Sequence, residues 1–144
     1  MTDFEPSEFE TTEPLLGRVV LITGANTGIG LVTAAELKRR GAHVFLACRS
    51  EERTMPALDH INMASGRVPA AFLPLDLGDF ASIRKCADLF MARKIPLHIL
   101  INNAGLAGSR GVTPSGFELA FGTNHVGHFL LTQLLLPRIR KSTP

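Results

Sequence analysis

The chain has 144 residues, of which 45% are apolar and 19% charged, and its formal net charge is +2. These totals are typical of a single globular domain with a real core, and they give no indication of a nucleic-acid-binding protein. Two cysteines are too few for a disulfide framework, so a reducing, cytoplasmic location is expected. No apolar run reaches the roughly 18 residues that a membrane span needs.

The first 14 residues differ from the rest of the chain in charge. They contain five acidic residues, two prolines and no basic residue, which leaves 8 acidic residues against 15 basic ones in the remainder. A polar, acidic segment of this kind cannot bury enough apolar surface to order itself. We therefore expect a disordered acidic leader at residues 1–14 and one domain at residues 15–144.

A strand, a glycine-rich turn and a helix follow the leader. The run Gly17 to Thr23 is mostly apolar and predicts a buried strand, and the pattern from Leu31 to Arg40 predicts an amphipathic helix that ends at Gly41. The turn between them reads Thr-Gly-Ala-Asn-Thr-Gly-Ile-Gly over residues 23–30. This order of elements is typical of a phosphate-binding site.

The residue types in the turn explain why it would bind an anion. Gly24 and Gly28 lack a Cβ, so the backbone can approach a pyrophosphate, and Gly30 allows close packing of helix on strand. The helix would present its free N–H groups to the anion. A P-loop is excluded because no Gly-Lys-Ser/Thr follows; a plain tight turn remains the alternative. The predicted cofactor-binding residues here are Thr23, Gly24, Asn26, Thr27, Gly28, Ile29 and Gly30.

The remaining chain continues the same alternation. Further strands are predicted at residues 43–48, 69–75 and 97–101, and helices at residues 51–65, 80–93 and 117–136. Ser50 is a candidate N-cap, Gly66 and Pro137 are candidate stop signals, and the last helix is unusually apolar. The alternation predicts an α/β fold of the Rossmann type, a doubly wound parallel sheet that is incomplete, with four strands in the order 3-2-1-4.

Ligands of such sheets bind beyond the carboxyl ends of the strands, where four segments would converge. The end of the second strand reads Ala47-Cys48-Arg49 and carries no acid for the ribose 2′-OH of NAD, whereas Arg49 suits the 2′-phosphate of NADP. A charged arginine–phosphate hydrogen bond contributes about 1.5–3 kcal/mol, or roughly tenfold to over a hundredfold in affinity. NADP is therefore predicted in preference to NAD, unless Arg49 simply faces water.

Four ordered motifs resemble the short-chain dehydrogenase/reductase family, and the sequences Ala47-Cys48-Arg49 and Asn124 to Leu131 resemble its retinol-dehydrogenase-like branch. The four motifs are Thr23-Gly24-x-x-x-Gly28-x-Gly30, Asp76-Leu77, Asn102-Asn103-Ala104-Gly105 and Asn124-His125-Val126-Gly127-His128-Phe129. The resemblance covers residues 15 to about 141. It implies that Asp76, followed by Leu77, contacts the adenine, and that Asn102, Ala104 and Gly105 line the nucleoside.

The resemblance also assigns Asn124 to the family's catalytic asparagine, which helps to hold a water linked to the active-site lysine. A polar residue in an apolar helix must find hydrogen-bond partners in any case. His125 and His128 are three residues apart, and with no third ligand in view we interpret them as packing or surface residues rather than metal ligands.

The family's chemistry uses a Tyr-x-x-x-Lys pair and a serine, and this chain contains no tyrosine. We therefore expect the front part of a longer protein or a truncated product. The fourth strand would be an open edge, and the last helix lacks cover, so self-association through either surface is expected.

Two functions from different classes follow. The first is the cofactor-binding part of an NADP(H)-dependent oxidoreductase that interconverts small-molecule carbonyls and alcohols by hydride transfer. The alternative is a catalytically inactive dinucleotide-binding or partner-docking module. A third interpretation, an interaction domain that binds no nucleotide, would hold if no dinucleotide binds.

Overall fold

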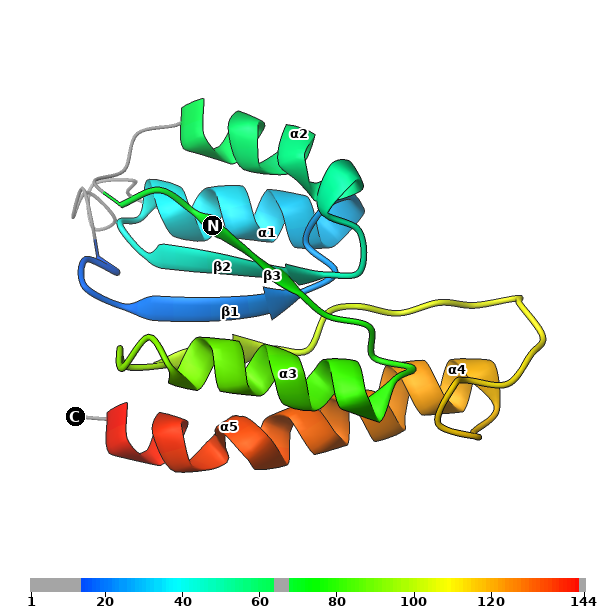
Figure 1. Ribbon diagram of the computed structural model, residues 1–144. Helices are drawn as coiled ribbons and strands as arrows, with labels where there is room; N and C mark the ends of the chain where they lie inside the picture. Colours follow the sequence, from blue (N-terminus) through cyan, green and yellow to red (C-terminus); the bar gives the residue numbers. More distant parts are fainter. Residues whose placement is uncertain (1–13, 64–67, 143–144) are drawn as a thin grey trace, which may run out of the picture.

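The structure is a computed structural model that describes residues 14–63 and 68–142. Four parallel strands form one sheet in the order β3-β2-β1-β4 (Figure 1), which confirms the predicted fold class. The strands are β1 (Val19–Thr23), β2 (His43–Cys48), β3 (Ala71–Pro74) and β4 (Ile99–Ile101). The predicted leader, apart from Pro14, and the predicted stop at Gly66 lie outside the described residues.

The centre of the sheet is β1, which pairs with β2 on one side and β4 on the other. All five of its residues are buried. Its side chains alternate between the faces, so that Leu21 packs with Phe45 and Phe90 on one face while Ile22 packs with Leu46 on the other. A strand buried on both faces needs the continuous apolar run that predicted it.

Two helices cover each face of the sheet (Figure 1). One face carries α1 (Gly28–Arg39) and α2 (Glu51–Met63), and the other carries α3 (Phe80–Met91) and α5 (His128–Ser142). Between β4 and α5 the chain runs through an extended loop and then α4 (Leu119–Phe121) and η2 (Gly122–Gly127), a π-helical turn. None of the described helices is long and apolar enough to cross a bilayer.

Local capping bonds explain where α2 and α3 begin. The Ser50 hydroxyl accepts a hydrogen bond from the Arg53 amide at 3.2 Å, as predicted for an N-cap, and the Asp79 carboxylate accepts one from the Ala81 amide at 2.9 Å. The prediction for the first helix was wrong by nearly a turn, since α1 begins at Gly28 and not at Leu31. Two turn glycines therefore belong to the helix itself.

The prediction of one continuous last helix from Phe117 to Leu136 was also wrong. The helix starts at Leu119, because the Glu118 carboxylate accepts hydrogen bonds from the amides of the next turn, and it widens into η2 before α5 begins. It also continues past Pro137 to Ser142. Tertiary bonds hold this last turn: the Arg138 guanidinium donates to the Ile95 carbonyl at 2.9 Å, and the Ser142 hydroxyl accepts from the Leu97 amide at 2.9 Å.

Candidate functional site

The four segments that were predicted to converge do meet at the carboxyl edge of the sheet. A cavity of about 260 Å³ lies there, between the glycine turn, the ends of β2 and β3, and the loop after β4. Seven of the predicted residues line it: Gly24, Asn26, Arg49, Asp76, Leu77, Ala104 and Gly105. The walls also include Cys48, from one of the converging segments, and Pro114, Leu119 and Thr123, which were not predicted.

The glycine turn has the shape that a phosphate cradle needs. Gly24 and Gly28 adopt left-handed φ angles of 64° and 57°, and no atom lies within 4 Å of the position that a Cβ on Gly28 would occupy. Thr27, the N-cap of α1, makes no side-chain capping bond, so the first helical amides are not claimed by it. The start of α1, where Ile29 is 81% exposed, is therefore accessible for an anion to approach the first helical N–H groups.

The other glycines of the turn serve packing. A Cβ on Gly24 would lie 2.8 Å from the Ala104 Cα, and one on Gly30 would lie 2.6 Å from the Gly24 carbonyl oxygen and 2.5 Å from the Asn103 side-chain nitrogen Nδ2. The absence of a Cβ at these two glycines thus lets the turn pack directly against the segment that follows β4. The predicted packing role of Gly30 is thus matched by the geometry.

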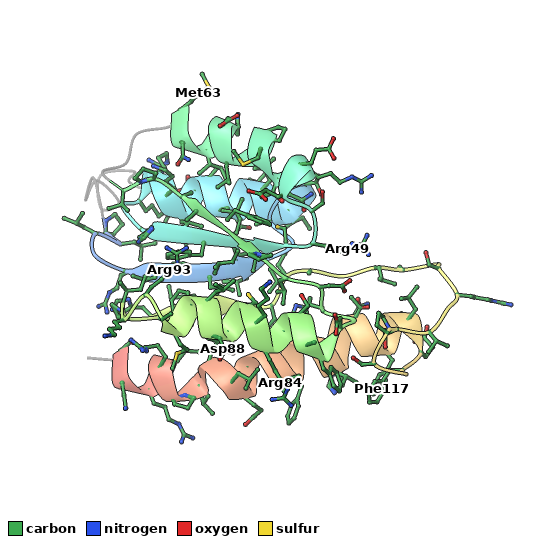
Figure 2. The ribbon with its side chains drawn as sticks, viewed as in Figure 1. Arg49, Met63, Arg84, Asp88, Arg93 and Phe117 are labelled. Atoms are coloured by element: carbon green, nitrogen blue, oxygen red, sulfur yellow. The ribbon has the colours of Figure 1, made fainter. Side chains whose placement is uncertain are left out.

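Arg49 lies at the carboxyl edge of the sheet, directly after β2 (Figure 2). Beside the main cavity it lines a second hollow of about 440 Å³, together with Asn26, Thr27, Ser50 and Arg53. Within the described ranges the only side-chain ion pairs join Glu36 to Arg39 and Arg40, so neither Arg49 nor Arg53 has a carboxylate partner there. Two free guanidinium groups beside the phosphate cradle suit a further anionic group.

Asp76 is held in a fixed orientation at the end of β3. Its carboxylate accepts the Gly78 amide at 2.9 Å, and its own amide donates to the Ser82 hydroxyl at 2.8 Å. Leu77, which is 5% exposed, belongs to the core, and its carbonyl packs against Gly127 so closely that no Cβ would fit. Asp76 thus lines the cavity with its carboxylate held by the Gly78 amide, while Leu77 joins the wall to η2.

The segment after β4 is tied to the glycine turn by Thr23 and Asn103. The Thr23 hydroxyl accepts the amides of Asn103 and Ala104 at 3.0 and 2.9 Å, and the Asn103 side chain donates to the carbonyls of Thr23 and Gly24 at 2.9 and 3.1 Å. Asn102 points elsewhere and donates to the Thr132 hydroxyl at 3.1 Å. The bonding of Thr23 and Asn103 supports the position of the loop that contributes Ala104 and Gly105 to the cavity.

Asn124 lies in η2, outside the main cavity. It lines a third hollow of about 330 Å³ with Asn102, His125, His128, Phe129 and Thr132. Its side-chain amide exchanges two hydrogen bonds with the backbone of Leu106, accepting at 2.9 Å and donating at 2.8 Å. A Cβ on Gly105 would lie 3.8 Å from its side-chain oxygen, so Asn124 also borders the loop of the main cavity. The hydrogen-bond partners expected for this polar residue are present.

Two residues beside the site were missed or undervalued by sequence reasoning. Asn103 stood in the quoted motif without a role, although it is a polar residue just after β4, at the edge of the sheet where ligands of such folds bind. His128 was interpreted as a packing or surface residue, and it is indeed buried, with 6% exposure. Its partner Thr23 is 105 residues away, a contact that no local pattern indicates. His125, by contrast, is exposed and stacks on Phe121 at 5.3 Å.

Burial also sets the chemistry of the two cysteines. It raises the pKa of the Cys48 thiol in the cavity wall, and it raises that of Cys86 to about 12. Both thiols are free and protonated at neutral pH. The cavity wall therefore carries one cation, Arg49, and one anion, Asp76, as its charged groups.

Comparison with known proteins identifies relatives along almost the whole chain. The family model described as short chain dehydrogenase matches residues 18–143. Retinol dehydrogenase 12 of mouse is 49% identical over 93% of this chain, human retinol dehydrogenase 11 is 47% identical over 93%, and bovine dehydrogenase/reductase SDR family member 13 is 49% identical over 90%. The chain spans 43%, 42% and 34% of the lengths of these three relatives.

Solved structures give the same result. The RhlG/NADP active-site complex of Pseudomonas aeruginosa superposes with a TM-score of 0.76 at 32% identity, over 90% of this chain and 51% of that one. A short chain dehydrogenase of Salmonella enterica serovar Typhi superposes with a TM-score of 0.77 at 33% identity, over 96% and 58%. The shared fold thus extends over nearly the whole chain.

Proposed function

The chain belongs to the short-chain dehydrogenase family, and we propose that it forms the cofactor-binding part of an NADP(H)-dependent oxidoreductase. The observation that carries this proposal is the convergence of the glycine turn, Arg49, Asp76 and Gly105 on one cavity of about 260 Å³. The cofactor, when bound, would donate a hydride to a small-molecule carbonyl in its reduced form and accept one from the alcohol in its oxidised form. Two of the relatives are named retinol dehydrogenases, so for a protein of their length we propose an apolar substrate.

The residues around the cavity divide the cofactor between them in this proposal. The N–H groups at the start of α1 and the bare backbone at Gly28 would hold the pyrophosphate. Arg49 would bind the 2′-phosphate in the neighbouring hollow, and Asp76 the adenine. Ala104 and Gly105 would line the nucleoside, with Asn102 behind them. The empty space at the missing Gly28 Cβ supports the fit of a phosphate group there.

Asn124 is proposed as the one residue of the family's catalytic set that this chain contributes. Its side chain is held on both sides by the Leu106 backbone, which fixes its orientation beside the Gly105 loop. The sequence contains no tyrosine to exchange a proton with the substrate. We therefore expect the 144-residue chain to bind NADPH without reducing carbonyls, and a cytoplasmic location is proposed on the strength of its two free thiols.

The test is the affinity of the chain for NADPH and NADH, measured by fluorescence titration, in the parent protein and in Arg49→Asp. Losing a charged arginine–phosphate hydrogen bond should weaken NADPH binding by roughly tenfold to over a hundredfold, whereas NADH should bind at least as tightly as to the parent chain, because the new carboxylate can accept from the ribose 2′-OH. Arg84→Asp, an exposed arginine on α3 away from the site (Figure 2), makes the same charge change and should alter neither affinity.

The outcomes separate the candidate functions. An unchanged NADPH/NADH ratio in Arg49→Asp would show that this arginine faces water and would remove the preference for NADP. Binding of neither dinucleotide by the parent chain would leave an interaction domain as the function. A chain of the relatives' length separates the remaining two candidates. If this chain is part of an enzyme, the longer chain should bind NADPH and reduce a carbonyl; if it is an inactive binding module, the longer chain should bind NADPH without reducing a carbonyl.

A further inference from the structure

The Thr23 hydroxyl lies at the centre of a buried cluster that neither the glycine turn nor the cavity explains. It accepts the amides of Asn103 and Ala104, and it lies 2.8 Å from the His128 Nε2 atom and 3.5 Å from the Ile101 carbonyl oxygen. A hydroxyl has two lone pairs and one hydrogen. Since the two amides occupy both lone pairs, the hydroxyl must donate its hydrogen, and the close partner is His128 Nε2. That ring nitrogen therefore acts as an acceptor.

The other nitrogen of the same ring has the opposite role. His128 Nδ1 lies 2.8 Å from the Asn124 carbonyl oxygen, which can only accept a hydrogen bond, so Nδ1 must carry a hydrogen. Together the two contacts specify one neutral form of His128, the Nδ1–H tautomer. Burial lowers the pKa of this imidazole, which favours the neutral ring. A protonated ring would aim an extra N–H at a hydroxyl whose lone pairs are already in use.

The turn that carries Asn124 is held on two sides. The His128 ring holds its carbonyl from one side, and on the other Gly127 presses against the Leu77 carbonyl, where no Cβ would fit. The turn is the π-helical segment η2, and such segments occur frequently at functional sites. The wider turn thus has a fixed position relative to both β1 and the end of β3.

We propose that His128 is a positioning residue that fixes the catalytic turn relative to the cofactor site by holding Thr23 and Asn124 through opposite nitrogens of one ring. The ring joins the end of β1 to η2, and Thr23 extends the connection to Asn103 and Ala104 at the cavity. The role in positioning the cofactor rests on the proposed function. The tautomer itself follows from the hydrogen bonds alone.

The tautomer can be measured directly on the 144-residue chain. Long-range 1H–15N correlation spectra of protein labelled with 15N-histidine distinguish the Nδ1–H from the Nε2–H tautomer for each ring. At pH 7.5 we expect His128 to give the Nδ1–H pattern and the exposed His125 to give a mixture. An Nε2–H pattern or a protonated ring at His128 would overturn the proposal, whether or not any dinucleotide binds.

Two substitutions separate the two bonds of the ring. In His128→Asn the amide nitrogen can take the place of Nδ1 and keep the bond to Asn124, but nothing reaches Thr23. In His128→Gln the amide oxygen can take the place of Nε2 and keep the bond to Thr23, but the bond to Asn124 is lost. His125→Gln, three residues away and exposed, serves as the control.

The two variants should fail in different ways. We expect His128→Asn to bind NADPH about 2- to 13-fold more weakly, the effect of one lost neutral hydrogen bond, and His128→Gln to bind within twofold of the parent chain. His128→Gln should instead shift the NMR signals of the Leu106 amide and the Asn124 side-chain amide, which report the catalytic turn.

Identical behaviour of both variants and the control would overturn the positioning role. If both variants fail to fold, the tautomer of the parent chain decides the question. Failure of the parent chain to bind NADPH would contradict the proposed function and leave the tautomer test intact.

Discussion

Two neighbouring strands of the sheet, β1 and β4, have similar sequences and very different surroundings. Every residue of β1, Val-Val-Leu-Ile-Thr, is buried, whereas all three residues of β4, Ile-Leu-Ile, are only half-buried. β1 has a paired strand on each side, while β4 pairs with β1 alone in the described part of the chain. Burial of a strand is therefore set by its place in the sheet, because an edge strand leaves one row of backbone and side-chain surface uncovered.

The same contrast extends to the elements beside each strand. The glycine turn next to β1 packs so tightly that Gly24 and Gly30 have no room for a Cβ. Beyond β4, Phe121 and Phe129 are 54% and 61% exposed on the last helical segments. The glycine turn is thus packed tightly where Gly24 and Gly30 meet the segment after β4, although its outer side at residues 27–29 is exposed, whereas the part that carries Asn124 presents exposed aromatic rings.

The sharpest test of this contrast uses a pair of leucines that face each other in register, Leu21 on β1 and Leu100 on β4. Leu21→Ala removes a fully buried side chain and should lower the free energy of unfolding by about 2–5 kcal/mol. Leu100→Ala removes a half-buried one, so its surroundings can relax into solvent and the loss should be clearly smaller. Urea unfolding followed by circular dichroism measures both. Equal losses would show that β4 is covered in solution, for example by a second copy of the chain.

A glycine substitution could instead break the contrast. A Cβ on Gly127 would meet the Leu77 carbonyl, a backbone atom that has no easy way to move. Gly127→Ala should therefore destabilise the chain by about 1–3 kcal/mol through overpacking, although it lies in the more exposed half. Gly105→Ala is the matched control, since its Cβ would lie an ordinary 3.8 Å from the Asn124 side-chain oxygen. A stable Gly127→Ala variant would contradict the fixed position of η2.

Acid should lower the free energy of unfolding through histidines that lie near β1 and in the last helix. Burial is the main cause that lowers the pKa of His43, His98 and His128, and the His98 Nδ1 atom also accepts the Val19 amide at 2.9 Å, which requires an unprotonated nitrogen. Histidines of the unfolded chain have the ordinary pKa of 6.5, so once the pH falls below 6.5 the unfolded chain binds more protons than the folded one. Stability should be complete above pH 6.5 and should fall as the pH drops through the lowered folded values.

Urea midpoints between pH 7.5 and pH 5 measure this loss. The window stays above the ordinary carboxylate value of 4.5 from which the pKa of Glu118 is lowered, and far above the value of about 2 that two arginine bonds impose on Glu36. Carboxylate protonation therefore contributes little within it. A midpoint that is flat across this range would contradict the neutral, hydrogen-bonded states assigned to these rings.

The smallest effect on stability should come from the exposed face itself. Phe129→Ser changes a residue that is 61% exposed, so the free energy of unfolding should change by no more than about 0.5 kcal/mol. We also propose that this face and the edge of β4 cause self-association, and the same substitution should shift the chain toward monomer in size-exclusion chromatography. A parent chain that elutes as a clean monomer would remove that proposal.

Much of the architecture could be predicted because local chemistry dictates it. Short, mostly apolar runs predicted the strands, and Ser50 marked a helix start through a bond to the amide three residues on. The conformation of the glycine turn could be predicted because the left-handed φ angles at Gly24 and Gly28 favour residues without a Cβ. Arg49 and Asp76 could be placed at the site because the ends of parallel strands share one edge of the sheet.

The tertiary structure decided what depends on distant partners. The run of apolar residues after Phe117 predicted a simple helix, but Leu77, 50 residues before Gly127, shapes the turn there, and bonds from Arg138 and Ser142 to the segment before β4 carry α5 past Pro137. His128 had an ambiguous sequence signal and acquired its tautomer only from Thr23 and Asn124. The sequence alone thus determined the strands, the conformation of the glycine turn and the family, because these are specified by apolar runs, by glycines and by short ordered motifs. The placement of Asn124 rests on contacts between residues far apart in the chain, and only the folded molecule specifies those.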